Sequence, residues 1–275
     1  MQFVKTTLAA SIFWIVGLNP AFTQTSNVVA LSTLRVCADP ANLPLSNDKG
    51  EGFENKIADL LGQKLGLPVE YVWFPQATGF VRRTLSEKRC DLIMGYAQGD
   101  ELVQNTNAYY RSSYVMIIKK DGALKGIENL DDPRLKSAKI GVIAGTPPAT
   151  ILALNALLGQ VKPYHLIVDR RHEAPAETMI NDLAGGAIDA AIACGPIGGY
   201  YANRIGKGAL QTVAMLNETK GPRMAFRITF GIRPGEPDWK HKLNELITEN
   251  QDAINSILIS FGVPLIDEQD KLINP

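Results

Sequence analysis

Strand and helix patterns alternate along most of the chain, and this alternation limits the possible folds more than any other feature. Short apolar runs at 33–39, 68–74 and 90–96 are separated by amphipathic patterns at 52–67 and 79–89. Strands that are separated by helices predict a parallel sheet with helices on its faces. Gly66 is expected to end the first helix.

The alternation restarts after a long extended run at 108–122. A second series of strands and helices begins at residue 138 and includes a strand predicted at 163–169. A further extended run at 223–234 leads into two closing helical segments. The first series has only three strands for the closing helices to cover, so the chain is expected to return to it. The fold class predicted is therefore α/β with two lobes, each a mostly parallel sheet flanked by helices.

Two extended crossings between such lobes predict a hinge with a cleft beside it. Lobe one is assigned to 33–115 and 226–275, and lobe two to 116–225. The predicted hinge residues are Val115, Met116, Ile117, Ala225, Phe226 and Arg227. Ligands of open α/β sheets bind beyond the carboxyl ends of the strands, which places the cleft there.

Residues 1–24 have the plan of a cleavable secretory signal peptide. Lys5 precedes an apolar stretch from Leu8 to Leu18, and Asn19-Pro20 with small or polar residues follow. The alternatives are a permanent membrane anchor and a buried helix. The apolar stretch is short for an anchor, and no basic flank follows it. We expect a periplasmic protein with no membrane insertion after cleavage.

The charge balance excludes two classes of partner. The chain has 28 Lys and Arg against 28 Asp and Glu, and it lacks a basic stripe. Binding to nucleic acid or to an anionic membrane surface is therefore not expected.

Export makes the three cysteines, Cys37, Cys90 and Cys194, relevant. Cys37 and Cys90 lie in the same predicted lobe and are the only plausible pair. Cys37 lies late in its strand and Cys90 begins another, which leaves their separation uncertain. The sequence is equally consistent with a Cys37–Cys90 disulfide and with three buried thiols.

The residues that could line the cleft follow predicted strands or begin helices. They are Asp39, Asn42, Ser46, Tyr96, Thr146, Cys194 and Tyr200. Capping and hydrogen bonding at loop ends is an equally good interpretation of the same residues.

Catalysis has little support in the sequence. His165, His172 and His241 are isolated, with no second ligand at metal spacing, and no dinucleotide fingerprint is present. Arg170 and Arg171 are interpreted as parts of a solvated loop. We expect that the protein is not an enzyme and that it binds no metal ion and no cofactor.

Several blocks resemble a known group in their expected order. "GFENKIADLLGQKLGLPVEYV", "YYRSSYVMIIKK", "IGVIAGT" and "AIDAAIACGPIGGYY" are similar to the periplasmic solute-binding proteins of the two-crossing type, with the topology of polar-amino-acid receptors. Five blocks, among them "LRVCADPANLPLSNDKGEGFENKIADLL", "GFVRRTLSEKRCDLIMGY" and "GTPPATIL", resemble the J proteins of bacterial methanol-oxidation operons, the MxaJ/XoxJ family.

The narrower resemblance implies a non-catalytic role beside a methanol dehydrogenase that carries pyrroloquinoline quinone. The protein would assist the maturation or activity of this enzyme, and the cytochrome c of the enzyme would be a further partner. The alternative is a transport receptor that delivers a small uncharged or cationic solute to an ABC permease.

The groups by which a receptor grips an amino acid are missing here. The loop after the third strand contains Glu101 and no Arg to hold a carboxylate. At the helix start after Gly145, Thr146 is a suitable N-cap, but Pro147 and Pro148 have no N–H groups to offer an anion.

The ammonium contact and the aromatic platform are missing as well. Cys194 stands where an acid would meet the ammonium group, and Leu45 stands where an aromatic ring would lie. The sequence therefore predicts a scaffold whose amino-acid site is dismantled.

Overall fold

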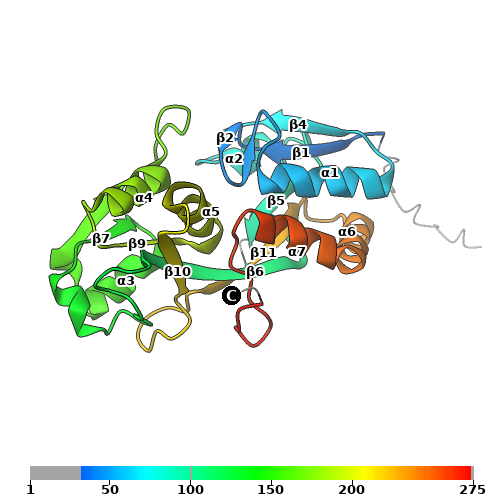
Figure 1. The fold of residues 1–275 in the computed structure, drawn as a ribbon. Coiled ribbons are helices and arrows are strands. Elements are labelled where there is room, and N and C mark those ends of the chain that lie inside the picture. The colour runs from blue at the N-terminus through cyan, green and yellow to red at the C-terminus, as the bar shows by residue number, and fades with distance from the viewer. Residues whose placement is uncertain (1–31, 100, 274–275) are drawn as a thin grey trace, which may run out of the picture.

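The computed structural model describes residues 32–99 and 101–273. The predicted signal peptide, residues 1–24, lies outside the described residues. Two lobes lie side by side, and one long strand runs from one into the other (Figure 1). The predicted fold class, a two-lobed α/β architecture with two hinge strands, is confirmed.

Lobe one contains the first elements of the chain and the last two helices. They are β1 (Leu34–Ala38), β2 (Ala41–Asn42), β3 (Ser46–Asn47), α1 (Phe53–Leu65), β4 (Val69–Trp73), α2 (Phe80–Arg83), β5 (Leu92–Ala97), α6 (Pro237–Glu249) and α7 (Gln251–Ser260). Gly66 ends α1 in the left-handed conformation, φ 68°, as the sequence predicted.

Lobe two contains the second series. Its elements are two 3-10 turns, Pro133–Ser137 and Leu158–Gln160, with β7 (Ile140–Ile143), α3 (Pro147–Leu154), β8 (Val161–Tyr164), α4 (Pro175–Gly185), β9 (Ala190–Cys194), α5 (Gly195–Gly206) and β10 (Leu210–Ala214). The crossing strands are β6 (Gln104–Lys119) and β11 (Ala225–Ile232).

Strand β6 joins the two sheets. The strand order is β4-β1-β5-β11-β6-β9-β7-β8, and β10 also pairs with β6. β6 pairs with β11 up to Ser113 and with β9 from Tyr114 onward. At the same point Tyr114 donates to the carbonyl of Met224 and accepts from the N–H of Met215.

The predicted lobe boundaries and the hinge role of the named residues stay predictions. The positions of these residues in the sheets can be described. Val115, Met116 and Ile117 are buried and pair with β9 and β10 in the lobe-two sheet. Ala225, Phe226 and Arg227 begin β11 and pair with 113, 112 and 111 of β6. The pairing changes two residues before the boundary predicted at 115/116.

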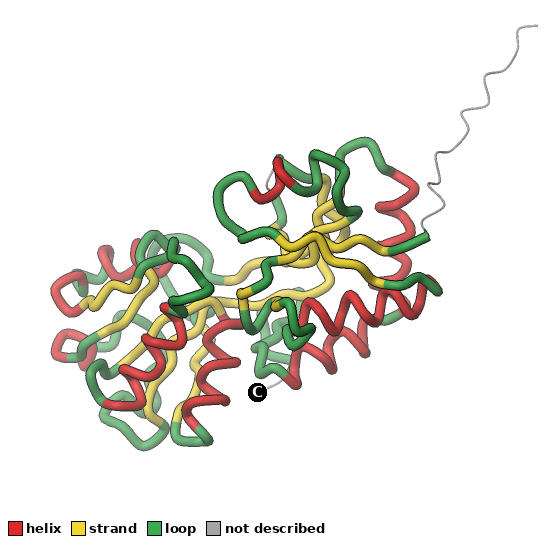
Figure 2. Tube along the Cα trace, turned by 90° about the horizontal axis from the view of Figure 1, so that it is seen from above, coloured by secondary structure: helices red, strands yellow, loops and turns green. Residues whose placement is uncertain are grey.

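Each sheet has an apolar core on both of its faces. In lobe one, α1, α6 and α7 cover one face of the sheet, and α2 covers the other. The core under α1, α6 and α7 includes Phe53, Ile57, Leu243 and Leu258. In lobe two, α3 lies on one face and α4 and α5 on the other. Figure 2 shows helices on the outer sides of the strands in both lobes.

Two predicted elements are shorter than the pattern indicated. The helix predicted at 79–89 contains only α2, because Thr84 leaves helical dihedrals and the chain turns at Lys88, φ 57°. The strand predicted at 163–169 stops at Tyr164. Its partner β7 ends at Ile143 and turns at Gly145, so residues 165–169 have no strand to pair with.

Cys37 and Cys90 form a disulfide in the structure, with their Cα atoms 5.6 Å apart. β1 and β5 are neighbours in the sheet, and Cys37 lies opposite Ile93, so the chain before β5 passes close to Cys37. Cys194 is unpaired.

Removing the disulfide should weaken lobe one. It spans 53 positions of the sequence, and closing a loop of that size restricts the unfolded chain. We expect the Cys37→Ala/Cys90→Ala variant to lose roughly 3–4 kcal/mol of unfolding free energy. Urea unfolding measures it, and the parent protein in reductant is the matched comparison. Equal midpoints for oxidised parent and variant would contradict the expectation.

Glu54 is a buried carboxyl at the start of α1. Burial raises its pKa to about 8, and the negative charge of Asp39 adds to this. Its Oε1 atom has no hydrogen-bond partner among the described residues, and it lies against Gly95 of β5, where no side chain would fit. The folded protein therefore holds the Glu54 proton at pH values where the unfolded chain has lost it.

This difference gives a pH dependence of stability with a defined sign. Between pH 4.5, the ordinary pKa, and about 8, the contribution of Glu54 to stability falls as pH rises. Glu54→Gln should therefore gain stability over the parent with rising pH, by at most about 1.4 kcal/mol per pH unit. Thermal unfolding from pH 5 to 8 measures this, with exposed Glu87→Gln as the control. A constant difference between variant and parent would refute it.

Candidate functional site

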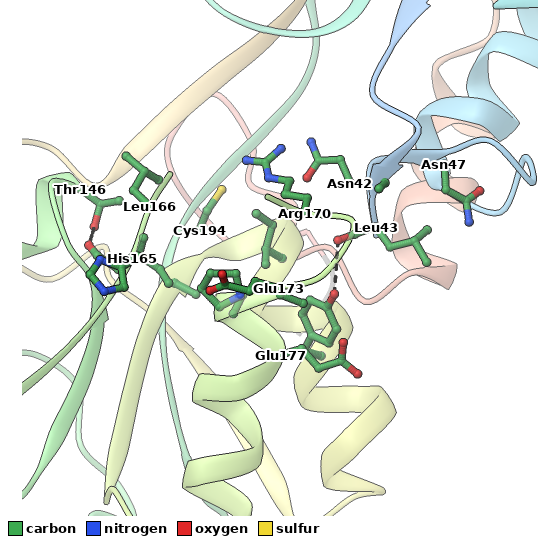
Figure 3. A pocket seen from close by; sticks show the side chains of 18 of the residues that line it. Asn42, Leu43, Asn47, Thr146, His165, Leu166, Arg170, Glu173, Glu177 and Cys194 are labelled. Atoms are coloured by element: carbon green, nitrogen blue, oxygen red, sulfur yellow. Dashed lines mark hydrogen bonds between the residues drawn. The ribbon is translucent and has the colours of Figure 1, made fainter. Parts of the chain in front are cut away.

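A pocket of about 480 Å³ lies between the lobes. One wall comes from the loop of lobe one that carries β2 and β3, and includes Asn42, Leu43 and Lys49. The other walls come from lobe two: the start of α3, the loop after β8, the start of α4, and the junction of β9 with α5. Figure 3 shows the side chains of both lobes facing this space.

Three of the predicted cleft residues line the pocket: Asn42, Thr146 and Cys194. Asn42 comes from lobe one, and its amide donates to Oε1 of Gln76 at 2.9 Å. Thr146 follows β7 and Cys194 is the last residue of β9, and these two strands are neighbours in lobe two. Strand ends thus bring them together across more than forty positions of sequence.

Asp39 and Ser46 form the buried support behind this wall. Asp39 follows β1 and accepts the N–H groups of Ala41 and Gln76 at 2.9 and 2.8 Å. Ser46 donates its hydroxyl to the Asp39 carbonyl at 2.9 Å. These contacts hold the β2–β3 loop in place.

Tyr96 and Tyr200 do not line the pocket. Tyr96 lies on β5 beside the small core of lobe one that contains the disulfide. Tyr200 lies on α5, where its ring stacks on Phe261, with centroids 6.1 Å apart.

Arg170 is a cleft residue that the sequence interpretation placed in a solvated loop. Its Nη1 lies 3.5 Å from Oδ2 of Asp39, so the two form an ion pair across the cleft. The interpretation was wrong because β8 ends at Tyr164, and the loop after it crosses the pocket. Arg171, its neighbour, is exposed and pairs with Asp169 at 2.6 Å.

Thr146 does not cap α3 with its side chain. Its hydroxyl donates back to the Ile143 carbonyl at 2.6 Å, and its N–H points to the same oxygen. Thr146 stands at the N-cap position, but the capping bond expected from the sequence is absent. Since Pro147 and Pro148 have no N–H, the first three residues of this helix start present no free donor.

Cys194 contributes a neutral group to the pocket. Burial raises the pKa of its thiol to about 12, so no thiolate forms near neutral pH. A neutral thiol cannot form an ion pair with an ammonium group, and it is a poor nucleophile.

The sequence analysis did not assign several other pocket residues to the cleft. His165, Glu173 and Glu177 lie on the loop after β8 and at the start of α4, and Tyr201 lies on α5. The Tyr201 hydroxyl donates to the Leu43 carbonyl at 3.4 Å, which links the lobes. The signal that could have found them is position, because they follow the carboxyl end of a parallel strand.

The residues that the structure describes contain no group of three or more His, Cys, Asp or Glu placed to hold a metal ion. Nor does any helix in this part of the chain have the length and apolarity needed to span a bilayer.

Two α/β lobes, two crossing strands and a cleft at the strand ends define a binding protein of the solute-receptor class. The chain belongs to the bacterial extracellular solute-binding proteins, family 3, whose model matches residues 34–255. Solved structures of similar fold include amino-acid-binding proteins, one of which is an ancestral protein described as a precursor of cyclohexadienyl dehydratase.

Among similar proteins, MoxJ of Paracoccus denitrificans is 27% identical over 265 residues, covering 90% of this chain and 92% of its own. The crystal structure of periplasmic binding protein XoxJ from Methylobacterium extorquens AM1 is 40% identical, with a TM-score of 0.73, and covers 86% of this chain and 100% of its own. The crystal structure of MxaJ from Methlophaga aminisulfidivorans MPT is 25% identical, with a TM-score of 0.71, and covers 85% of this chain and 100% of its own. The predicted resemblance to the MxaJ/XoxJ family is confirmed.

The two partners of the cleft ion pair should differ in their effect on stability. Asp39→Ala removes a buried carboxylate and leaves the partly buried N–H groups of Ala41 and Gln76 without their acceptor. It should cost about 2–3 kcal/mol of unfolding free energy. Arg170→Gln removes only a long ion pair, 3.5 Å, whose arginine side chain is 33% exposed, and should cost less than about 1 kcal/mol. Urea unfolding of both variants measures this. Equal costs would show that the ion pair, and not the loop, carries the effect of Asp39.

Proposed function

We propose that this chain is a non-catalytic periplasmic partner of a quinoprotein methanol or alcohol dehydrogenase, and that it assists the maturation or activity of that enzyme. The proposal includes export, with removal of a signal peptide near residue 24. The cytochrome c of the same system is a further candidate partner.

The chemistry of the cleft carries the proposal. At the helix start where a receptor would bind a carboxylate, Thr146 uses its hydroxyl and N–H internally, and two prolines follow. Where an acid would meet an ammonium group, Cys194 offers a neutral thiol. Arg170, the one guanidinium among the residues that line the pocket, is paired with Asp39. These features disfavour a zwitterionic ligand held at both ends.

The edge of the cleft supports contact with a protein. The loop after β8 carries Leu166 and Ile167, whose exposed fractions are 48% and 79%. Leu166 also lines the pocket, so the exposed apolar surface continues into the cleft. Exposed apolar side chains that are grouped beside a groove are typical of interaction sites.

The family resemblance supports the kind of partner. The blocks that resemble the J proteins of methanol-oxidation operons imply a dehydrogenase with pyrroloquinoline quinone, and 40% identity to XoxJ over that whole chain agrees with this.

A transport receptor for a small cationic solute is the second candidate. Glu173 and Glu177 line the pocket, and no ion pair of either is found in the described part of the chain. Pocket carboxylates that form no ion pair favour a cation over an anion.

Binding to the dehydrogenase tests the proposal directly. Purified protein is mixed with the cofactor-free and the complete dehydrogenase, and the dissociation constant and dehydrogenase activity are measured. We expect a complex, and at least tenfold weaker binding for Leu166→Ser/Ile167→Ser, since burial of two such side chains contributes several kcal/mol.

The matched control is Leu154→Ser/Leu158→Ser. These two leucines are also exposed, 53% and 59%. Leu154 is the last residue of α3, Leu158 begins the 3-10 turn after it, and neither lines the pocket. Absence of any complex, together with a rise in melting temperature on adding an organic amine, would favour the transport receptor instead.

A further inference from the structure

Helix α5 of lobe two packs directly against the C-terminal segment of lobe one, which we define as residues 261–273. Both lie beside the crossing of β6 (Figure 1). The C-terminal segment is bound to β6 just before the crossing: Ser112 donates its hydroxyl to the Pro264 carbonyl at 2.6 Å, and Ile266 donates to the Arg111 carbonyl at 3.1 Å.

Glycines let the two backbones approach closely. A methyl group on Gly199 would overlap the carbonyl oxygen of Gly262. Gly262 is equally confined, because a methyl group there would overlap the Asn203 amide and lie 3.1 Å from the Gly199 carbonyl oxygen. Contact between these backbones therefore leaves no room for a side chain on either side.

Gly195 makes a second contact of the same kind. A methyl group at Gly195 would overlap the Ser113 carbonyl oxygen, and would lie 2.7 Å from the Ser112 hydroxyl and 2.8 Å from the Pro264 ring. Ser113 is the last residue of β6 that pairs with β11. The start of α5 is thus seated against the crossing itself.

Aromatic rings extend the contact toward the core of lobe one. Tyr200 of α5 stacks on Phe261 at an interplanar angle of 22°, and Phe261 packs edge-on against Phe53 of α1, with centroids 5.9 Å apart. Tyr200, which the sequence proposed as a cleft residue, belongs to this contact.

Ion pairs fix the remainder of the C-terminal segment. Arg111, only 8% exposed, binds Glu268 at 2.6 Å and Asp270 at 2.7 Å. Arg223 also pairs with Asp270, and the residue after it, Met224, is buried in the lobe-two core. This last pair therefore connects the second crossing with lobe one.

We infer that α5 and the C-terminal segment form a latch that fixes the angle between the lobes, so that the cleft keeps one shape without a ligand. Rotation of the lobes would have to separate backbones that are in van der Waals contact at two glycines. Close-packed contacts of this kind resist displacement and have few alternative arrangements. The exposed ion pairs add less than the packing does.

The latch is independent of the partner. A transport receptor needs two lobe arrangements, whereas a docking protein can present one fixed surface. The latch can therefore fail its own test while the proposed dehydrogenase complex still forms, and the reverse also holds.

Distance measurements between spin labels test the latch. Labels at exposed Lys64→Cys in lobe one and Lys136→Cys in lobe two report the lobe separation by double electron–electron resonance. We expect one narrow distribution in the parent, unchanged by a mixture of amino acids. Gly199→Ala should shift or broaden it and lower the melting temperature, although alanine favours helix more than glycine does.

Gly185→Ala is the matched control, since Gly185 is also helical and has open space where the methyl group would lie. It should keep the parent distribution. If Gly199→Ala does not fold, Tyr200→Ala removes the ring stacked on Phe261 and should broaden the distribution. Two populations in the parent, or a parent-like distribution in the Gly199→Ala and Tyr200→Ala variants, would overturn the latch.

Discussion

The pairing of β6 organises the molecule, because this one strand belongs to both sheets. Its first ten residues pair with β11 and the rest with β9 and β10, and the change falls between Ser113 and Tyr114. At this point the backbone of Tyr114 is also hydrogen-bonded to the backbones of Met215 and Met224, which lie between β10 and β11. Since α5 and the C-terminal segment also meet here, the angle between the lobes, and with it the width of the cleft, is set at this point.

The cleft keeps the architecture of a solute receptor with altered chemistry. Its helix start has no free donor at Thr146, Pro147 and Pro148, its strand end offers the neutral thiol of Cys194, and its arginine is held by Asp39. Apolar side chains at the edge of the pocket remain exposed. A fixed groove with an apolar edge suits contact with a protein surface better than enclosure of an amino acid.

Much of the fold could be predicted because it depends on local patterns. Apolar runs and amphipathic periods located the strands and helices of lobe one, apart from the short β2 and β3, and both crossing strands. Gly66 marked the end of α1. The predictions at 79–89 and 163–169 were too long for different reasons. Thr84 and Lys88 turn the chain toward the disulfide, and β8 has no partner beyond Tyr164. Neither cause is visible in a local apolar pattern.

The sequence alone determined the family, the alternation of strands and helices, and the residue types at the strand ends, because these follow from the order of side chains along the chain. Only the tertiary structure decided that Arg170 reaches Asp39, that Tyr200 leaves the cleft for Phe261, and that Cys37 meets Cys90. Each of these contacts joins segments far apart in sequence, and its geometry depends on how sheets and lobes are placed in space.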